Sequence, residues 1–310
     1  MKVSRLMFSW ICVTLVLCAS LGYAEEKQTL ETPQDVAAYL QEISVTIKAG
    51  YAEGSGTAIV RKIDGEEVTF VWTAAHVVDG LRKEKTVVTP DGTKRTKVVF
   101  DDCSLVQEVR QDGRRVGEWK FDARVLRFSA EEDLSLLMVR KRGLLEASAR
   151  FYLEDEIPAV GTELYHCGSP GGQSLGANSV TSGILSQIGR TFPDEIGEFD
   201  QATVACLPGS SGGGVFNVET GEYLGMLTMG IRGQDSFAYF VPVRRIAKWC
   251  ENTEMEWAVD EDADTPTLEE LRKMHVEDVG NIGKFGEASV DEKSKDRYHL
   301  IRTTEPEISL

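Results

Sequence analysis

Short apolar stretches separated by turn signals fill the chain from about residue 43 to residue 243. Apolar and polar residues alternate from Ile43 to Ile47, as they do in a half-buried strand. Asp64-Gly65, a strong hairpin signal, separates an apolar run that ends at Val60 from the run Val68 to Thr73. Short strands with a turn about every 8–12 residues predict an all-β sandwich or barrel.

The same pattern continues through two β-rich halves of about 100 residues each. Turns are expected at Pro90-Asp91-Gly92, Asp112-Gly113, Ser169–Gly172 and Gly221-Glu222, where glycine, proline and acidic or amide residues cluster. The strands expected between these turns are 54–60, 86–89, 97–100, 105–109, 119–128, 134–139, 164–168, 180–188, 201–205, 215–218, 223–229 and 237–243.

Three helices are predicted outside the strands. One opens at Thr32-Pro33 and runs to about Gln41, and another runs from Arg244 to about Cys250. A third is expected from Pro266 to His275, with Thr265 as its N-cap and glutamates in its first turns.

Composition changes at about residue 251. The 310 residues are 42% hydrophobic, enough for a sizeable core, and carry a net charge of −16. Residues 251–310 hold 17 acidic and 7 basic residues and few apolar ones, so apart from the third helix we expect this tail to be disordered or loosely attached. The composition of such a tail is compatible with three roles: autoinhibition, partner docking, or a passive contribution to solubility. No basic patch is visible, which argues against nucleic-acid binding.

Residues 1–24 have the pattern of a secretory signal peptide. Lys2 and Arg5 precede a mostly apolar run, and Gly22-Tyr23-Ala24 offers small residues for cleavage before Glu25. A secreted or periplasmic protein is therefore expected, with an uncleaved membrane anchor as the alternative. No later segment has the length to span a bilayer, so the mature form is not expected to be membrane-embedded.

Four cysteines remain after cleavage: Cys103, Cys167, Cys206 and Cys250. In an exported chain they allow disulfides with three possible pairings, and four buried free thiols are equally allowed. Their spacing matches no zinc pattern, and we predict neither a metal nor a cofactor. The oligomeric state is left open.

The stretch Gly209-Ser210-Ser211-Gly212-Gly213 has the composition of a turn that exposes a nucleophilic serine. Glycines adopt backbone angles that other residues avoid, and they leave amide N–H groups accessible. The N–H groups of Gly209 and Ser211 are candidates to bind the oxygen of an attacked carbonyl. A flexible linker is the alternative, but predicted strands flank the stretch on both sides.

A serine nucleophile needs a general base, and His76 is the best candidate among the four histidines. It follows a strand inside the small-residue turn Thr73-Ala74-Ala75-His76. His275 and His299 lie in the acidic tail, and His166, inside an apolar strand, is expected to be a core residue.

Three segments in the order His, Asp, Ser resemble the trypsin-like (chymotrypsin-fold) serine endopeptidases. They are TAAHVV at 73–78, EEDLSLLMV at 131–139 and PGSSGGGVF at 208–216. GSGTAIV at 54–60 and GSPGGQSLGANSVTSGILSQIGR at 168–190 are similar to the bacterial HtrA/Deg-type branch. The resemblance covers about residues 35–250.

This resemblance implies an all-β fold of two six-stranded antiparallel barrels, followed by a C-terminal helix and the acidic tail. The expected units are the signal peptide 1–24, a first barrel in 25–145, a second barrel with its closing helix in 146–250, and the tail 251–310. The implied catalytic residues are His76 as general base, Asp133 as its orienting carboxylate and Ser211, rather than Ser210, as nucleophile.

The resemblance also implies polypeptide substrates and a mode of binding them. Thr228-Met229-Gly230 matches the strand that pairs with the substrate backbone, and Ala205 matches the base of the specificity pocket. Because alanine supplies no charge there, we expect cleavage after small or medium apolar residues.

The sequence departs from the family at three places. Gly214 stands where proline is usual, and the long connection between His76 and Asp133 predicts an additional hairpin on the first barrel. The tail has neither the length nor the strand pattern of the PDZ domain common in HtrA proteins. Two other functions are alternatives: an inactive binding module of the same fold, and a cysteine hydrolase using Cys206, or Cys167 beside His166.

Overall fold

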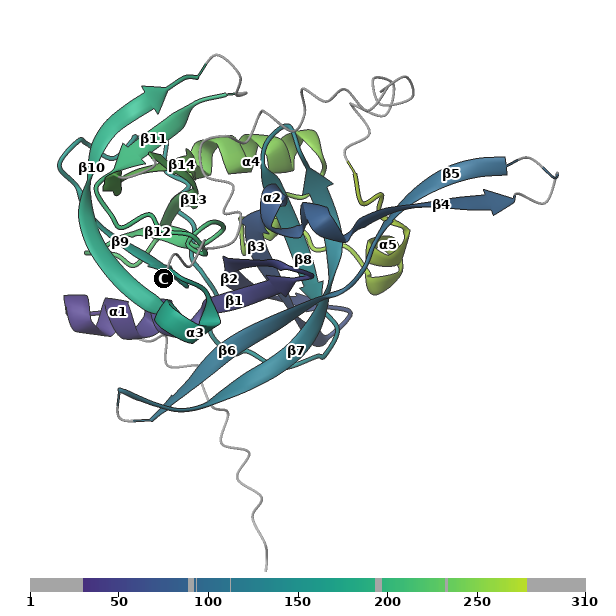
Figure 1. Cartoon of the computed structure of the whole chain (residues 1–310), viewed down its shortest axis with the longest axis horizontal. Helices are drawn as coiled ribbons and strands as arrows, with labels where there is room; N and C mark the ends of the chain where they lie inside the picture. Colours follow the sequence, from purple (N-terminus) through teal and green to yellow (C-terminus); the bar gives the residue numbers. More distant parts are fainter. Residues whose placement is uncertain are drawn as a thin grey trace, which may run out of the picture.

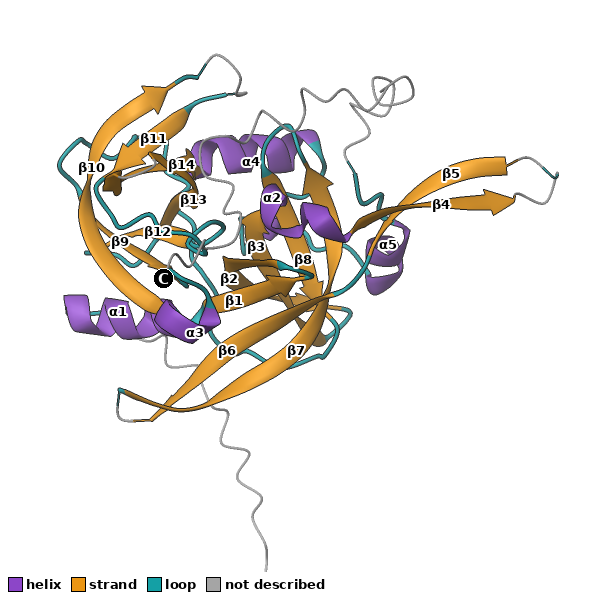
Figure 2. Cartoon of the chain, in the orientation of Figure 1, coloured by secondary structure: helices purple, strands orange, loops and turns teal. Residues whose placement is uncertain are grey.

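Two closed antiparallel barrels of six strands each form the body of the protein in a computed structural model. The structure describes residues 30–277 except 89–91, 93, 112, 193–196 and 232–233. The predicted signal peptide, the residues after Glu277 and His299 therefore lie outside the described residues. Strands dominate both barrels, and the few helices lie outside them (Figure 1, Figure 2). The predicted all-β, two-barrel fold is confirmed.

The first barrel closes in the order β1-β2-β3-β8-β7-β6, with β6 paired back to β1. Its strands are β1 (Ser44–Ala49), β2 (Ala52–Ile63), β3 (Glu66–Ala74), β6 (Cys103–Gln111), β7 (Arg114–Ser129) and β8 (Leu134–Val139). The β2–β3 hairpin turns at Asp64 and Gly65, whose φ values of 50° and 84° are those that an Asp-Gly turn favours.

The second barrel closes in the order β10-β11-β14-β13-β12-β9, with β9 paired to β10. Its strands are β9 (Glu163–Gly168), β10 (Ser179–Arg190), β11 (Phe199–Ala202), β12 (Gly214–Asn217), β13 (Tyr223–Ile231) and β14 (Gln234–Pro242). The Gly-Ser-rich stretch lies between β11 and β12, so it connects two barrel strands and is not a linker.

An additional two-stranded sheet extends from the first barrel, as the long connection after His76 predicted. β4 (Arg82–Val88) pairs with β5 (Lys94–Phe100), and neither strand belongs to a barrel. The pair projects away from the body of the protein (Figure 1).

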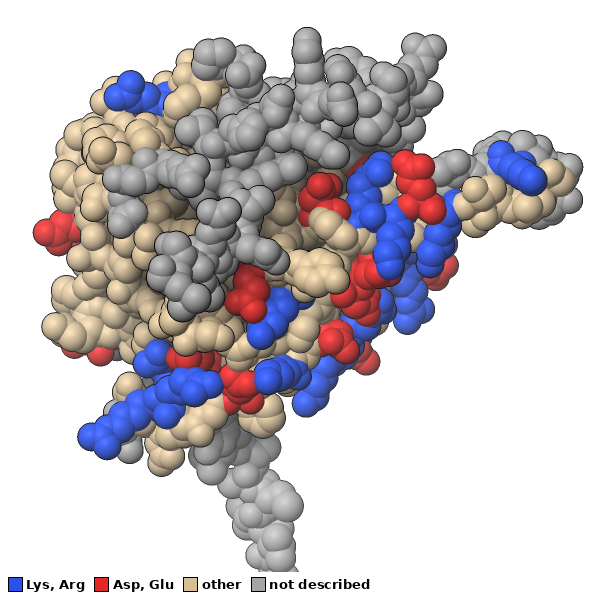
Figure 3. Space-filling model, viewed as in Figure 1, with Lys and Arg blue, Asp and Glu red and all other residues tan. Residues whose placement is uncertain are grey.

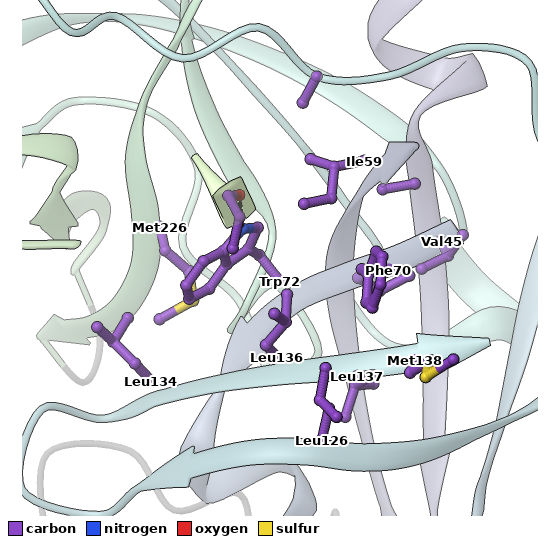
Figure 4. Packing of buried hydrophobic residues seen from close by; sticks show 14 of the residues in the cluster. Val45, Ile59, Phe70, Trp72, Leu126, Leu134, Leu136, Leu137, Met138 and Met226 are labelled. Atoms are coloured by element: carbon purple, nitrogen blue, oxygen red, sulfur yellow. Dashed lines mark hydrogen bonds between the residues drawn. The ribbon is translucent and has the colours of Figure 1, made fainter. Parts of the chain in front are cut away.

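One hydrophobic cluster continues from the first barrel into the second. Trp72 of β3 is fully buried, and its ring meets Trp249 edge-on at 5.9 Å between centroids. Figure 4 shows Trp72 close to Leu136 of the first barrel and to Met226 of the second. Because this shared core fixes the barrels against each other, side chains from both can be held at their junction.

Two longer helices pack against the barrel strands. α1 (Pro33–Glu42) begins as predicted, with Thr32 as its N-cap in a capping box with Asp35. α4 (Val243–Asn252) follows the last barrel strand and buries Ile246 and Trp249. The short helices are α2 (Ala75–Val78), η1 (Asp79–Leu81), α3 (Gln173–Gly176), η2 (Glu256–Ala258) and α5 (Leu268–Lys273).

Residues 253–277, which we call the strap, pack on the first barrel and are not loosely attached. Trp257 is 2% exposed and Leu271 is fully buried in the main hydrophobic cluster. The carbonyl of Trp257 accepts a hydrogen bond from Arg61 Nε at 2.6 Å, and that of Ala258 accepts one from Trp72 Nε1 at 3.0 Å. The expectation of a loose tail was therefore wrong for this segment.

The strap ends beside β7, where the Phe128 N–H donates to the carbonyl of Val276 at 2.7 Å. Its helix α5 starts at Leu268, with Thr267 rather than Thr265 as N-cap, so the predicted start at Pro266 was also wrong.

A chain truncated after residue 254 would lose the buried Trp257 and Leu271, so a test of tail autoinhibition needs a cut after Glu277.

All four cysteines are free and buried, which decides between the alternatives left by the sequence. Among the described residues, no helix is both long and apolar enough to cross a membrane.

Candidate active site

The side chains of His76 and Asp133 meet at one end of the first barrel. His76 lies in α2, directly after β3, and Asp133 directly precedes β8, the neighbour of β3 in the sheet. His76 Nδ1 lies 3.0 Å from both carboxylate oxygens of Asp133. The backbone N–H of His76 donates to Asp133 Oδ1, also at 3.0 Å. The carboxylate thus fixes both the ring and the backbone of the histidine.

Asp133 is held in its ionised form. Burial by itself raises the pKa of this carboxyl, but the His76 charge and ring hydrogen bond, the Thr228 hydroxyl and the His76 backbone N–H together bring it below its usual value. An ionised carboxylate at this place favours the histidine tautomer that carries its proton on Nδ1.

A residue of the closing helix α4 holds the turn that presents Asp133. Asp133 itself has a φ of 53°, a left-handed conformation that is uncommon for a residue with a Cβ. Next to it, Glu132 accepts a hydrogen bond from Arg245 Nε at 2.7 Å, and its carbonyl accepts one from Arg245 Nη2 at 3.3 Å. Arg245 belongs to α4, so this ion pair connects the closing helix to the turn.

Thr228 of β13 connects Ser211 to the His76–Asp133 pair. Ser211 Oγ lies 3.4 Å from the carbonyl oxygen of Thr228 and donates to it. The hydroxyl of the same Thr228 donates to Asp133 Oδ2 in a short hydrogen bond. One residue of the second barrel therefore contacts both the predicted nucleophile and the predicted orienting carboxylate, and all three predicted catalytic residues gather at the junction between the barrels.

In the turn around Ser211, two amide N–H groups point away from the donors that bind the carbonyls of the same peptide groups. The carbonyl of Pro208 accepts from Gly171 N–H at 2.6 Å, and that of Ser210 accepts from Gly213 N–H at 3.0 Å. In a planar trans peptide the N–H points opposite to the carbonyl, so the N–H groups of Gly209 and Ser211 point away from these donors. Within the described residues, neither N–H donates a hydrogen bond.

Two glycines of this turn are required by its shape. Gly209 has a φ of 90°, and a Cβ there would lie 2.4 Å from the carbonyl oxygen of Ser169. Gly212 has a φ of 87°, and a Cβ there would lie 2.2 Å from the carbonyl oxygen of Ser55. Any larger residue at either position would have to move the backbone of the turn.

Ser55 of β2 attaches the turn to the first barrel. Its N–H donates to the carbonyl of Ser211 at 2.8 Å, and its hydroxyl donates to the carbonyl of Gly209 at 2.6 Å. The same hydroxyl accepts from the N–H of Ser169 at 2.8 Å. The buried Ser55 therefore holds two segments of the second barrel in register with β2.

The predicted substrate-binding residues lie on the segments that border Ser211. Met229 and Gly230 follow Thr228 on β13, where they pair with Tyr239 and Ala238 of β14. Ala205 is half-buried in the same connection that carries Ser211. Whether these residues form a specificity pocket stays a prediction.

His166 is a buried core residue, as expected. It is 1% exposed, and its Nδ1–H donates to the carbonyl of Gly214 at 3.0 Å, while Nε2 has no hydrogen-bond partner among the described residues. Burial lowers the pKa of His166 to about 4 and raises that of Cys167 to about 12. A neutral thiol is a poor nucleophile, which counts against a cysteine hydrolase at this pair.

His166 predicts a loss of stability in mild acid. The pKa of His166 is lower in the folded than in the unfolded chain, so the unfolded chain takes up a proton first as the pH falls. The free energy of unfolding therefore has its full value above about pH 6.5 and decreases as the pH falls toward 4. From pH 7.5 to 4.5 we expect a loss of about 2–3 kcal/mol, measured by urea unfolding. His166→Leu should remove this loss, and the matched control His275→Leu, at an exposed position, should keep it. An equal loss in His166→Leu would contradict the assignment.

Several contacts of this site were not expected from the sequence. The Thr228–Asp133 bond and the Arg245–Glu132 pair join residues 95 and 113 positions apart, and no local pattern signals either. Ser55 did carry a signal, since it stands between two glycines in a stretch where close backbone approach was expected. No cluster of His, Cys, Asp and Glu suited to a metal occurs in the described part of the chain.

Known proteins match parts of this chain in sequence. A probable periplasmic serine endoprotease, DegP-like, from Ectopseudomonas mendocina (strain ymp) is 37% identical over 108 residues, which is 34% of this chain and 21% of that protein. A putative serine protease HhoA from Synechocystis sp. (strain ATCC 27184 / PCC 6803 / Kazusa) is 30% identical over 160 residues, 50% of this chain and 38% of that protein. The chain thus aligns with well under half the length of these relatives.

Solved structures share the fold at low sequence identity. The HtrA-type protease AlgW with tripeptide superposes with a TM-score of 0.53 and 18% identity, covering 74% of this chain and 65% of that one. The serine endoprotease from Yersinia pestis gives a TM-score of 0.50 and 19% identity, covering 72% and 67%. Residues 54–226, more than half of the chain, match the family model described as a trypsin-like peptidase domain. With its two barrels and its His-Asp-Ser order, the chain belongs to the trypsin-like peptidase domain family.

Proposed function

We propose that this protein hydrolyses peptide bonds as a serine endopeptidase, through an acyl-enzyme formed on Ser211. The observation that carries the proposal is the contact of His76 with the ionised Asp133, while Thr228 bonds both Asp133 and Ser211. The relatives are named as a serine endoprotease and a serine protease, which supports the same reaction class.

In the proposed reaction, one proton passes from Ser211 to His76 and then to the leaving amine. Asp133 accepts the Nδ1–H of His76, which leaves Nε2 as the base that takes the proton of Ser211 Oγ. The serine oxygen then attacks the scissile carbonyl carbon, and Asp133 stabilises the imidazolium that forms. His76 next gives the proton to the leaving amine, and a water molecule repeats the sequence to release the acid from Ser211.

The N–H groups of Gly209 and Ser211 are the proposed donors to the oxyanion. Support comes from their orientation, opposite to the bonded carbonyls of Pro208 and Ser210. Donors that are already oriented need no rearrangement as negative charge develops, and removing one such donor typically slows a reaction about 100- to 1000-fold.

The activity itself is tested with casein, a generic substrate. The full mature chain should degrade casein, and a fluorophosphonate should stop the degradation, because it reacts with an activated serine hydroxyl. An inactive binding module of the same fold would be well folded and leave casein intact, which would contradict the proposal.

Substrate preference gives a finer prediction. Ala205, where the family resemblance places the pocket base, brings no carboxylate, so a basic side chain would lose its hydration without gaining a counter-ion. In a panel of peptides that differ only at P1, kcat/KM should be at least about tenfold higher for Ala or Val than for Arg or Lys, a difference of about 1.4 kcal/mol. A clear preference for Arg or Lys would contradict this specificity.

We also propose export to the periplasm or the exterior. The predicted signal peptide at 1–24 and the periplasmic relatives support it. N-terminal sequencing of the recovered protein should find Glu25 first, whereas an intact Met1 would indicate a retained anchor.

A further inference from the structure

A cavity of about 250 Å³ lies between the strap and the first barrel, away from the candidate active site. The residues that line it are Arg124, Met138, Val139, Arg140, Arg142, Leu268 and Arg272, so four of the seven are arginines and none is acidic. Leu268 and Arg272 lie four positions apart, on one face of α5. Val139 ends the strand that begins beside Asp133, which places the cavity roughly 20 Å from that carboxylate at the strand's rise per residue.

Arginine is concentrated in the lining of this cavity, and the nearby carboxylates lie outside the lining. Asp102 pairs with Arg140 through two bonds of 2.6 and 2.7 Å, and Glu66 lies 3.6 Å from Arg142 Nε. Asp122 also acts electrostatically on Arg140, and Asp64 Oδ2 accepts a hydrogen bond from the N–H of Leu268 at 2.9 Å. Burial, followed by repulsion from Arg140 and Arg142, lowers the pKa of Arg124. A lining with four arginines and no acidic residue is unusual in a chain whose net charge is −16.

A different arrangement holds on the surface of β6 and β7. There, Glu108 pairs with Arg110 and Arg115, and Glu118 pairs with Arg115 and Lys120. Figure 3 shows positive and negative side chains interleaved along one face of the molecule. On that surface each of the two carboxylates contacts two cationic side chains, whereas none of the residues that line the cavity is acidic.

Several guanidinium N–H groups at the cavity have no protein acceptor. Arg142 Nη1 is buried and makes no hydrogen bond within the described residues. Arg272 is exposed and forms no ion pair there. Arg124 directs one N–H to the carbonyl of Leu271 at 3.0 Å, which holds the guanidinium against α5. A buried donor without an acceptor is unfavourable, and a bound anion would satisfy it.

We propose that this cavity binds a small multivalent oxyanion of the phosphate or diphosphate type. Guanidinium groups match the oxygens of a phosphoryl group in pairs of parallel hydrogen bonds. At about 30 Å³ for each water molecule in the liquid, the cavity holds about eight waters, comparable to the nine heavy atoms of diphosphate. The anion would bridge Arg272 of the strap and the arginines of the first barrel, and so fasten α5 to the barrel.

Diphosphate binding to the full mature chain tests the proposal by calorimetry and thermal unfolding. We expect one binding site and a rise in Tm of several degrees at about 100-fold excess over Kd, compared with NaCl of equal ionic strength. Arg142→Gln and Arg272→Gln should each weaken binding at least about tenfold, and the double variant about 100-fold. Orthophosphate should bind the same site more weakly.

Arg114→Gln is the matched control, since it removes the same charge at an exposed position near the tip of the β6–β7 hairpin. It should bind diphosphate like the unchanged protein. The proposal is overturned by the absence of saturable binding, by an equal loss in Arg114→Gln, or by a Tm rise that persists in the double variant. If the double variant does not fold, Arg272→Gln alone decides, because Arg272 is exposed and forms no ion pair within the described residues.

Discussion

Ser211→Ala is expected to lower kcat/KM for a peptide substrate by at least about 10⁴-fold. The reason is that Ser211 Oγ is the proposed nucleophile, while the neighbouring Ser210 is fully buried. Stability should change little, because the hydroxyl makes a single long bond of 3.4 Å to the carbonyl of Thr228. Steady-state kinetics on the best peptide of the P1 panel, with Tm measured beside it, checks both expectations.

The neighbouring serine provides the control for this experiment. Ser210 is fully buried, and its hydroxyl accepts a hydrogen bond from the N–H of Leu207 at 3.4 Å. Ser210→Ala should therefore keep kcat/KM within about tenfold of the unchanged protein, which corresponds to losing one neutral hydrogen bond. Equal losses in Ser210→Ala and Ser211→Ala would indicate damage to the turn rather than removal of a nucleophile.

Asp133→Asn is expected to lower kcat by about 10⁴-fold at neutral pH. An asparagine retains the size of the side chain but can donate toward His76 Nδ1, which favours the tautomer whose Nε2 already carries a proton. KM should change little, because Asp133 is not expected to contact substrate. The measurement is a comparison of kcat and KM for the variant and the unchanged protein.

The exposed Glu131, two positions before Asp133, offers a matched control for loss of a carboxylate. Glu131→Gln should leave kcat within a few-fold of the unchanged value, as is usual for an exposed position. A small effect of Asp133→Asn would remove this carboxylate from the proposed mechanism, even though it contacts the ring of His76.

Local sequence signals predicted those parts of the fold in which neighbouring residues determine the structure. The Asp64-Gly65 hairpin and the Thr32 N-cap are examples, since the turn angles and the cap bond depend on residues next to each other. The start of α5 was also predictable. Thr267 is followed by Glu270 at the spacing of a capping box, whereas Thr265 has Leu268 at that spacing.

The packing of the strap could not be read from composition. Its buried residues, Met255, the short run 257–259 and Leu271, are few and lie among many acidic residues, so the average composition of the segment is that of a disordered tail. What holds the strap is a set of bonds from Arg61 and Trp72 to its carbonyls, about 190 residues away along the chain, and local patterns carry no information on such pairs.

The candidate site also has residues that the sequence predicted and contacts that it could not predict. Motif order in the sequence identified His76, Asp133 and Ser211, and the structure brings them to one junction. The connections that hold them there come from Thr228 and Arg245, whose roles depend on how the two barrels pack. Thr228 was expected on a substrate-binding strand, and its bond to Asp133 could be found only once the barrels were assembled.

The most direct test of the central claim is to locate a fluorophosphonate adduct by mass spectrometry of the intact and digested protein. Activation of a single serine by His76 and Asp133 predicts one adduct per chain, on Ser211, and its absence in both Ser211→Ala and His76→Ala. Labelling should persist in Ser210→Ala. A folded protein that stays unlabelled, or that carries its adduct on another residue, would contradict the proposal that Ser211 is an activated nucleophile.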